Sequence, residues 1–248
     1  MLRLIAALCL SLLCALPAAA VDQHSFTPAE KAAIDAEVRA YLLAHPEVLV
    51  EAMHALDAKQ AAAQAASDQA LVKANAKALF SDPASWVGGN PKGDVTVVEF
   101  MDYRCPYCHE AYSQVSQLVG SDGHIRFIVK EYPILGPQSE LSARFAIAVL
   151  QSAGAAAYGK IHDALMTYRG EFTRASLAAI AGKEGLDGKA LLKAMNGAAV
   201  SKVIDDNLAL GAKMAVAGTP TFVIADQVVR GYVPLRQMQQ MVAAARKN

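Results

Sequence analysis

The spacing of apolar positions predicts two amphipathic helices near the start of the chain. Thr27-Pro28-Ala29-Glu30 is a typical helix start, because threonine can cap, proline suits the first turn and glutamate completes a capping box. Apolar residues then recur at helical spacing, at Ile34, Val38, Tyr41 and Leu42. Pro46 opens a second helix with the stripe Val48, Leu49, Ala52, Met53 and Leu56. Residues 59–78 are Ala-rich, so a helix over 47–79 would extend on the order of 50 Å.

The apolar stripe of these helices needs a partner. The helices either lie on the rest of the chain or pair with another copy of it. We expect the second arrangement, because two amphipathic segments precede a long polar stretch. Residues 21–82 are therefore predicted to form an oligomerisation arm, and Gly88-Gly89-Asn90-Pro91 marks a boundary after it.

Beyond this boundary the pattern changes to buried strands and helices. The segments 95–100 and 125–132 read as buried strands around a helix at 109–119, which fits a parallel crossover unit. Helical patterning then fills residues 134–217, with candidate helices at 139–150, 156–168, 174–184, 189–195 and 200–214. A hairpin of strands 221–225 and 228–232 and a helix at 235–245 follow. The order predicts an α/β domain over residues 90–248 with a helical insertion at about 134–217.

The first twenty residues have the pattern of a cleavable secretory signal. Arg3 precedes an apolar run from Leu4 to Leu16, and Ala18-Ala19-Ala20 supplies the small residues that signal peptidase accepts. A membrane anchor is the alternative, but the run is shorter than the roughly 20 apolar residues of a span. We expect residues 1–20 to be removed after Ala20.

Composition narrows the range of partners. The chain has 248 residues, of which 54% are hydrophobic and 19% charged, as in a soluble globular protein. Its 23 basic and 23 acidic residues cancel, and no dense Lys/Arg cluster is present. We expect no nucleic-acid partner, because phosphate binding needs a concentrated positive field.

Removal of the signal leaves two cysteines, Cys105 and Cys108, because Cys9 and Cys14 lie within it. A disulfide scaffold uses several scattered pairs, whereas one close pair in an oxidising compartment indicates chemistry. An inert disulfide is the structural alternative. A loop this short gains only about 2 kcal/mol from chain entropy, so the pair would stabilise the fold inefficiently.

Cys105 is the predicted nucleophile of a disulfide exchange catalyst. At the amino end of a helix its thiolate would face unpaired N–H groups and the positive end of the helix dipole. Such surroundings lower thiol pKa values to roughly 3.5–7.5. Cys108, one turn further on, would be the resolving thiol, and Pro106 would rigidify the turn without losing a needed donor.

Two metal-based alternatives use the same segment. Cys105, Cys108 and His109 form C-x-x-C-H, the attachment motif of c-type haem, but the motif directly follows a hydrophobic strand instead of a helix or loop. Zinc would need a second ligand pair at fixed spacing, and the six histidines are scattered. We expect no metal and no cofactor, and we expect His109 to be a surface residue of the helix.

Glu99 and Pro220 complete the candidate site. Glu99 lies in an apolar strand, where a carboxylate is costly unless paired or protonated. A raised pKa would let it exchange protons with Cys108, whereas an edge position in water is the alternative. Gly218-Thr219-Pro220-Thr221 precedes a strand, and a cis bond before Pro220 would leave nearby backbone groups free to pair with an extended substrate.

The segments Glu99–Cys108 and Gly218–Phe222 resemble the DsbA-like branch of thioredoxin-fold proteins. The resemblance covers residues 90–245 and implies an α/β thioredoxin fold with an inserted helical subdomain, preceded by an extended helical N-terminal arm. It implies that Cys105 attacks, Cys108 is the buried thiol, Pro220 is the cis proline and Glu99 holds the buried acidic position. Thr219 would lie at the substrate surface, with Pro106, Tyr107 and Pro220 as the other substrate-binding residues.

The arm makes the chain similar to the bacterial suppressor-of-copper-sensitivity protein C group, whose members can trimerise and act as disulfide isomerases. This resemblance implies a periplasmic homo-oligomer, with a trimer favoured, that acts on misoxidised exported proteins and is kept reduced by a membrane thiol reductase. Tyr107 replaces a histidine of the strong oxidase, which implies a less oxidising protein. The alternatives are a dithiol oxidase served by a membrane oxidase, and a copper-binding protein that uses the same thiols.

Overall fold

The computed structural model describes residues 26–247. The predicted signal segment, residues 1–20, lies outside the described residues. The chain divides into two compact units, residues 1–57 and residues 58–248. Helix α2, Glu47–Ala74, contributes its first part to one unit and its remainder to the other.

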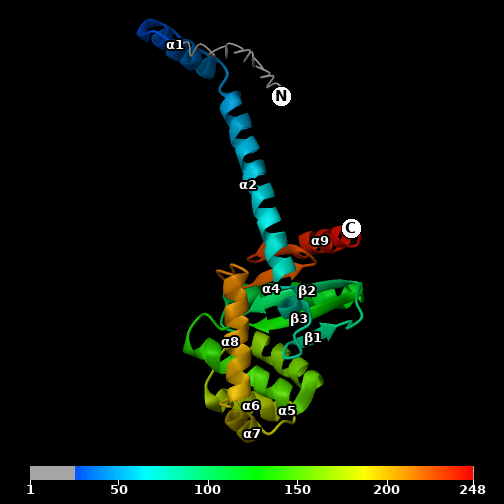
Figure 1. The fold of residues 1–248 in the computed structure, drawn as a ribbon. Helices are drawn as coiled ribbons and strands as arrows, with labels where there is room; N and C mark the ends of the chain where they lie inside the picture. Colours follow the sequence, from blue (N-terminus) through cyan, green and yellow to red (C-terminus); the bar gives the residue numbers. More distant parts are fainter. Residues whose placement is uncertain (1–25, 248) are drawn as a thin grey trace, which may run out of the picture. The chain divides into compact units, whose positions relative to one another are not determined.

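The first unit contains α1, Pro28–Ala44, and the start of α2 (blue to cyan in Figure 1). The predicted capping box is present, because Glu30 N donates to Thr27 Oγ1 at 3.3 Å and Thr27 N donates to Glu30 Oε2 at 2.8 Å. No residue of α1 is buried. The exposed large apolar residues of this unit include Ile34, Val38, Tyr41, Leu43, Leu49, Val50, Met53 and Leu56. Its own fold therefore leaves an apolar surface uncovered.

A five-stranded sheet in the order β1-β3-β2-β4-β5 forms the centre of the second unit (Figure 1). The strands are β1 (Trp86–Gly89), β2 (Val95–Met101), β3 (Ile125–Glu131), β4 (Thr221–Ile224) and β5 (Gln227–Arg230). Strands β2 and β3 are parallel, with Val95 opposite Ile125 and Met101 opposite Glu131. The other pairs of strands are antiparallel.

Helices cover both faces of the sheet. The helices that lie wholly within this unit are α3 (Ala76–Phe80), α4 (Pro106–Asp122), α5 (Pro137–Thr167), α6 (Arg174–Lys183), α7 (Gly188–Ala194), α8 (Ala198–Lys213) and α9 (Leu235–Ala245), of which α6 and α7 pack on α5. Helix α5 is interrupted at Gly154, where φ is 84°, so it agrees with the two helices expected there. The architecture confirms the predicted fold class, an α/β thioredoxin-like sheet with an inserted run of helices.

Alternation along β2 and β3 divides the core into two layers. Val97 and Met101 pack with residues of α4, α5 and α9, whereas Val98 and Phe100 pack with residues of α2, α3 and α8. Each fully buried apolar side chain of this kind contributes about 1.5–3 kcal/mol. The layers hold the carboxyl end of β2 and the start of α4 in fixed positions.

The sequence did not predict β1, because its glycines indicated only a boundary. Trp86 lies against Phe127 and Tyr158, with ring centroids at 6.3 and 5.2 Å, and its Nε1 donates to Ala155 O at 2.9 Å. Gly88 leaves room for this ring, since an added Cβ would lie 2.2 Å from it. The contacts of one tryptophan thus turn a glycine-rich segment into an edge strand.

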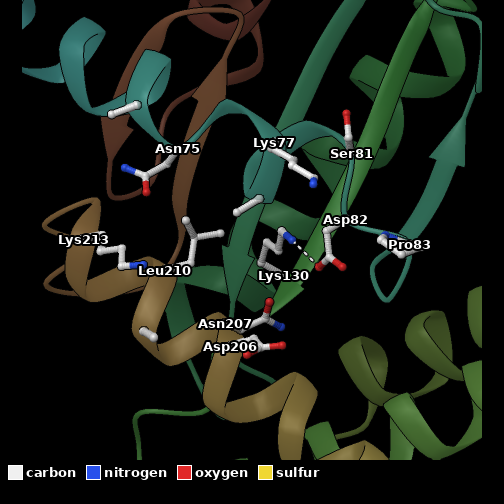
Figure 2. A pocket seen from close by; sticks show the side chains of 13 residues that line it. Asn75, Lys77, Ser81, Asp82, Pro83, Lys130, Asp206, Asn207, Leu210 and Lys213 are labelled. Atoms are coloured by element: carbon white, nitrogen blue, oxygen red, sulfur yellow. Dashed lines mark hydrogen bonds and ion pairs between the residues drawn. The ribbon is translucent and has the colours of Figure 1, made fainter.

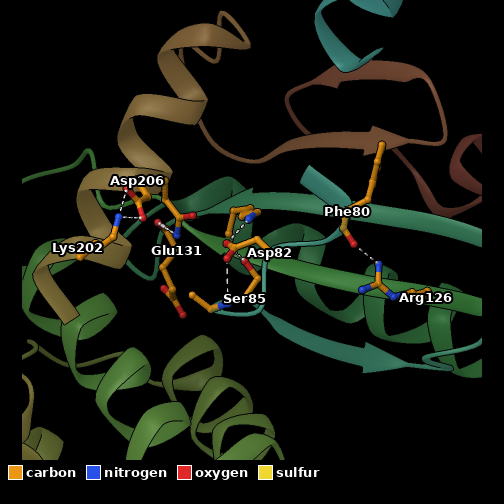
Figure 3. Close-up of polar contacts among 10 residues, drawn as sticks. Phe80, Asp82, Ser85, Arg126, Glu131, Lys202 and Asp206 are labelled. Atoms are coloured by element: carbon orange, nitrogen blue, oxygen red, sulfur yellow. Dashed lines mark hydrogen bonds and ion pairs between the residues drawn. The ribbon is translucent and has the colours of Figure 1, made fainter. Parts of the chain in front are cut away.

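An ion pair lies in the layer of side chains between the sheet and the helices α3 and α8. Lys130 on β3 donates to Asp82 Oδ2 at 2.7 Å, and its side chain is 1% exposed (Figure 2). Asp82 also accepts from Ala84 N at 2.9 Å and from Ser85 Oγ at 2.8 Å (Figure 3). The pair borders a hollow of about 430 Å³, whose walls include Asn75, Lys77, Asn207, Leu210 and Lys213.

Candidate active site

Cys105 and Cys108 lie at the amino end of α4. Cys105 is the N-cap residue, Pro106 occupies the first turn, and Cys108 follows within that turn. Cys105 N donates to Asp102 O at 3.0 Å, which fixes the turn between β2 and α4. Both side chains are free thiols; Cys105 is 4% exposed and Cys108 is fully buried. This placement is the one that the motif predicted.

The surroundings of Cys105 favour its thiolate. The Cys108 thiol, the Thr219 hydroxyl and the backbone N–H groups of Cys108 and Tyr107 act on the sulfur, and together they outweigh burial and lower its pKa to about 5. The two backbone N–H groups are unpaired donors of the helix start, directed at the negative charge on the sulfur. Cys105 is therefore mostly ionised at neutral pH and suited to nucleophilic attack.

Cys108 has the opposite character. Its pKa is raised far above the ordinary value, first because it donates to the Cys105 sulfur, then because it is buried and lies near the carboxyl of Glu99. The two thiols thus share one proton, which Cys108 holds. Cys108 can attack only after that proton has been removed.

Glu99 provides a nearby group able to take the proton. It is 3% exposed on β2, opposite Val129 of β3 and Phe222 of β4, so the alternative of an edge position in water is excluded. No cation pairs with it among residues 26–247. Burial, followed by the charges of Cys105 and Glu131, raises the pKa of Glu99 to about 8. A carboxyl with this pKa exchanges protons near neutral pH.

A cavity of about 200 Å³ adjoins Glu99 between α4, α5 and the sheet. Its walls include Trp86, Tyr112, Ser116, His162 and Asp163. Tyr112 OH donates to Asp163 Oδ1 at 2.7 Å, and both Ser116 and Asp163 are exposed to solvent. Glu99 is therefore buried beside polar space that approaches the surface.

A second buried carboxyl, Glu131, was not predicted. Its Oε1 accepts from Tyr103 OH at 2.8 Å and from Tyr158 OH at 2.5 Å, and Tyr103 OH lies 3.0 Å from His162 Nδ1. Burial raises the pKa of Glu131 to about 8 although the two tyrosines act against this, and burial lowers the pKa of His162 to about 4. The only signal for Glu131 in the sequence was an acidic residue at the end of an apolar strand. The reasoning used for Glu99, that a carboxylate in an apolar strand is costly, applies to it as well.

The loop before β4 borders the sulfur. The Thr219–Pro220 peptide bond is cis, and Cys105 Sγ lies 3.0 Å from Thr219 O, which accepts a hydrogen bond from this sulfur when it carries a proton. Tyr107 is 61% exposed beside the motif. The structure thus brings together all the predicted site residues, although their roles in binding and catalysis stay predictions.

The expectation for His109 was wrong. His109 is half-buried, and its Nδ1 lies 2.5 Å from Met166 O and 2.9 Å from Arg169 Nη1. The region at the end of α5, within the helical insertion, supplies these contacts, and sequence spacing along α4 gives no information about them.

Comparison with known protein families shows which family the chain belongs to. Residues 81–244 match the family described as Thioredoxin. The chain belongs to the thioredoxin family. Residues 30–63 match the family described as Copper resistance protein ScsC N-terminal domain. The resemblance to the DsbA-like and suppressor-of-copper-sensitivity group is thereby confirmed.

Solved structures agree with this assignment. A thioredoxin-like oxidoreductase from Silicibacter pomeroyi DSS-3 is 42% identical, with a TM-score of 0.65, over 69% of this chain and 98% of that one. BcfH from Salmonella enterica Typhimurium is 28% identical, with a TM-score of 0.71, over 88% and 96%. Proteus mirabilis ScsC in a transitional conformation is 27% identical, with a TM-score of 0.65, over 89% and 98%.

The match to the curated relatives covers only part of their length. The Na(+)/H(+) antiporter NhaA 1 of Salinispora arenicola is 28% identical over 167 residues, which are 64% of this chain and 24% of that protein. The chain thus spans about a quarter of that relative's length. Within residues 26–247, none of the helices is both long enough and apolar enough to cross a bilayer.

Proposed function

We propose that this protein is a periplasmic thiol–disulfide oxidoreductase whose main activity is disulfide isomerisation. The observation that carries the proposal is the contrast between the two sulfurs, with Cys105 at a pKa of about 5 and Cys108 held protonated behind it. The periplasmic location rests on the predicted signal segment and on a solved relative from Salmonella enterica Typhimurium described as a periplasmic thioredoxin-like protein.

The exchange begins when the Cys105 thiolate attacks one sulfur of a substrate disulfide. The substrate S–S bond breaks as the mixed disulfide forms, and the departing thiolate accepts a proton. In isomerisation, another thiolate of the substrate attacks the mixed disulfide and releases Cys105 unchanged. In reduction, Cys108 gives its proton to an ionised Glu99 and attacks Cys105, which leaves a Cys105–Cys108 disulfide and a reduced substrate.

The substrates in this proposal are misoxidised exported proteins. Thr219 and Pro220 lie beside the attacking sulfur, and an extended segment would pair with backbone groups of this loop. Tyr107 presents an exposed ring on the other part of the same motif. A membrane thiol reductase would return the pair to the dithiol form after each accidental oxidation.

The first unit supports oligomerisation. Its exposed apolar stripe extends from Ile34 to Leu56, within the segment that matches the ScsC N-terminal domain. Contiguous apolar surface of this kind marks a protein interface. We propose a homo-oligomer, with a trimer favoured, in which several active sites raise the local concentration of thiolate around one substrate.

Copper binding is a second candidate, favoured by the description of the family that matches residues 30–63. Two thiols suit Cu(I), which prefers soft ligands. No group of three or more His, Cys, Asp or Glu side chains in the described part of the chain is arranged to hold a metal ion. Copper binding would be favoured over disulfide exchange by two results together. The wild type would bind Cu(I) tightly and stoichiometrically but show no redox turnover, and Cys105→Ser would lose the Cu(I) binding.

The experiment that tests the main proposal is repair of a scrambled, fully oxidised protein. Cys105→Ser should abolish repair, while Cys108→Ser should accumulate mixed disulfides visible on non-reducing gels. Pro220→Thr should also prolong such complexes. Persistence of repair in Cys105→Ser would contradict disulfide exchange at this site.

Substitutions in the arm separate isomerase from oxidase. Leu49→Glu with Met53→Glu should dissociate the oligomer and reduce repair of scrambled substrate, while dithiol oxidation by the oxidised protein continues. Glu51→Gln, on the exposed surface of the same helix, is the matched control. If the dissociated variant repairs scrambled substrate at the wild-type rate, the proposed role of the oligomer is wrong. If the wild type oxidises dithiols but repairs no scrambled substrate, the protein acts as a dithiol oxidase instead.

A further inference from the structure

A basic hollow of about 420 Å³ lies beside the active-site turn. Its walls are Arg104, Pro106, His109, Glu110, Tyr168 and Arg169. Arg104 and Pro106 are the chain neighbours of Cys105, and Arg169 follows the end of α5 within the helical insertion. Neither Thr219 nor Pro220 belongs to this lining. The hollow is thus a surface next to the nucleophile but separate from the loop before β4.

The guanidinium groups of the two arginines of the hollow contact backbone carbonyls and an imidazole, whereas the backbone of Arg104 bonds to a carboxylate. Arg104 N donates to Asp102 Oδ1 at 2.8 Å, and its Nη1 donates to Gly170 O at 3.3 Å. Arg169 Nη1 donates to Met166 O at 2.9 Å and lies 2.9 Å from His109 Nδ1. One nitrogen of each guanidinium makes these side-chain contacts, so most of its five N–H donors stay available.

Three other arginines of the same unit, Arg144, Arg230 and Arg246, are paired with carboxylates. Arg230 binds both oxygens of Asp68 at 2.8 Å, and Arg144 donates to Glu140 at 2.7 Å. Neither Arg104 nor Arg169 pairs with a carboxylate within residues 26–247. Glu110 is the acidic member of the lining, and it bonds to neither arginine. The hollow therefore presents two unpaired positive charges to whatever approaches Cys105.

We propose that this hollow binds a carboxylate carried by the substrate close to the disulfide that Cys105 attacks. The inference rests on the proposed exchange activity and adds its preference for acidic substrates. A planar guanidinium matches a carboxylate with two parallel N–H···O bonds. The carboxylate belongs either to an acidic side chain next to the cysteine of a polypeptide or to a small anionic disulfide such as glutathione disulfide.

The test uses two disulfide-linked peptides that differ only in Glu or Gln beside the cysteine. For the wild type, kcat/KM should be about fivefold higher for the Glu peptide, and the preference should shrink at 1 M salt. Arg169→Gln and Arg104→Gln should each bring the ratio of the two kcat/KM values close to one. Arg174→Gln, whose side chain bonds to Leu192 O outside the hollow, is the matched control and should keep the wild-type ratio.

A parallel arm with glutathione disulfide separates the two sources of the carboxylate. Loss of rate in Arg169→Gln with the Glu peptide alone assigns the hollow to polypeptides, and loss with glutathione disulfide alone assigns it to the small thiol. Equal wild-type rates for both peptides, together with an unchanged glutathione rate in both arginine variants, would overturn the inference while leaving exchange intact. If neither peptide nor glutathione disulfide reacts with the wild type, the proposed function itself fails.

Discussion

The two faces of strands β2 and β3 differ in whether their buried ionisable side chains have a partner of opposite charge. On one face, Lys130 is 1% exposed and is paired with Asp82 at 2.7 Å. On the other face, Glu99 and Glu131 are each 3% exposed and have no cation beside them among the described residues. The same pair of strands therefore carries a neutralised charge on one side (Figure 2) and two carboxyls without a cation on the other.

This difference in charge pairing indicates a structural role for the ion pair and a chemical role for the carboxyls without a cation. A buried ion pair offsets part of its desolvation cost, and loss of either partner leaves an uncompensated charge. An unpaired buried carboxyl instead keeps its proton, so its pKa rises into the range where proton exchange is useful. We infer that the Lys130–Asp82 pair holds the fold together, whereas Glu99 serves the sulfurs.

The largest effect should come from Glu99→Gln. The pKa of Glu99 is raised from 4.5 to about 8 by burial first, so the folded protein retains a proton that the unfolded chain loses. The unfolding free energy of the wild type therefore falls as pH rises from about 4.5 to about 8. The variant has no carboxyl at position 99, so it lacks this contribution to the pH dependence. Relative to the variant, the wild type should lose about 4 kcal/mol of unfolding free energy over that interval. Attack by Cys108 should also slow about tenfold.

Denaturant unfolding of both proteins at several pH values measures this difference. Glu131 titrates in the same range, because burial raises its pKa to about 8 as well, so part of the slope will remain in the variant. The exposed substitution Glu171→Gln is the control and should leave the wild-type pH profile unchanged. Parallel pH profiles for wild type and Glu99→Gln would show that Glu99 is ionised in the folded state.

Lys130→Met should have the next largest effect. It removes the cation beside Asp82, whose side chain is 24% exposed, and the remaining carboxylate should cost about 3 kcal/mol of unfolding free energy. Thiolate formation at Cys105 should not change, because Lys130 lies on the opposite face of the sheet. Urea denaturation and the pH dependence of Cys105 alkylation measure the two quantities.

The double variant Lys130→Met, Asp82→Leu sharpens this result. It removes both charges, so it should recover more than half of the lost stability. Recovery will be incomplete because Asp82 also accepts from Ala84 N and Ser85 Oγ. If the single variant is as stable as the wild type, the ion pair is not the element that holds this face.

Tyr158→Phe should have a smaller effect, confined to the carboxyl face. It removes a donor to Glu131 Oε1, and because that donor lowers the pKa of Glu131, the pKa should rise further. Loss of one buried hydrogen bond to a carboxyl should cost about 1–2 kcal/mol, more above pH 8 than below it. Thermal or urea unfolding at pH 6 and pH 9 measures this, with Tyr168→Phe as the control. An equal loss at both pH values would contradict a link to Glu131.

Much of this arrangement could be predicted from the sequence, because the signals were local. The capping box at Thr27, the strand before Cys105 and the helix after it all depend on residues within a few positions of one another. Glu99 was also predictable, since a carboxyl in an apolar strand has few favourable environments. The order of these elements predicted an α/β domain with a helical insertion, and the resemblance of the motif segments implied the thioredoxin fold.

The remaining parts depend on contacts between distant segments. Glu131 meets Tyr103 and Tyr158, which lie 28 and 27 positions away, and periodicity does not show such pairings. In the sequence, Lys130 is only a charged residue near the end of a strand. Its partner Asp82 lies 48 positions earlier, so the ion pair is evident only in the folded chain. Strand β1 was missed for the same reason, because Trp86 gains its partners only in the folded chain.

The smallest effect should come from Asp206→Asn, in an ion pair near the rim of the same hollow as Lys130 (Figure 3). Lys202 and Asp206 are 2.8 Å apart, one helical turn from each other on α8, and their side chains are 73% and 61% exposed. Water already solvates both charges, and an exposed pair loses about as much side-chain freedom as it gains in attraction. The urea midpoint should therefore stay within experimental error of the wild type, at low salt and at 1 M salt alike. A clear loss, comparable with that of Lys130→Met, would mean that burial does not distinguish the two pairs, and the contrast between the faces would then have to rest on Glu99 alone.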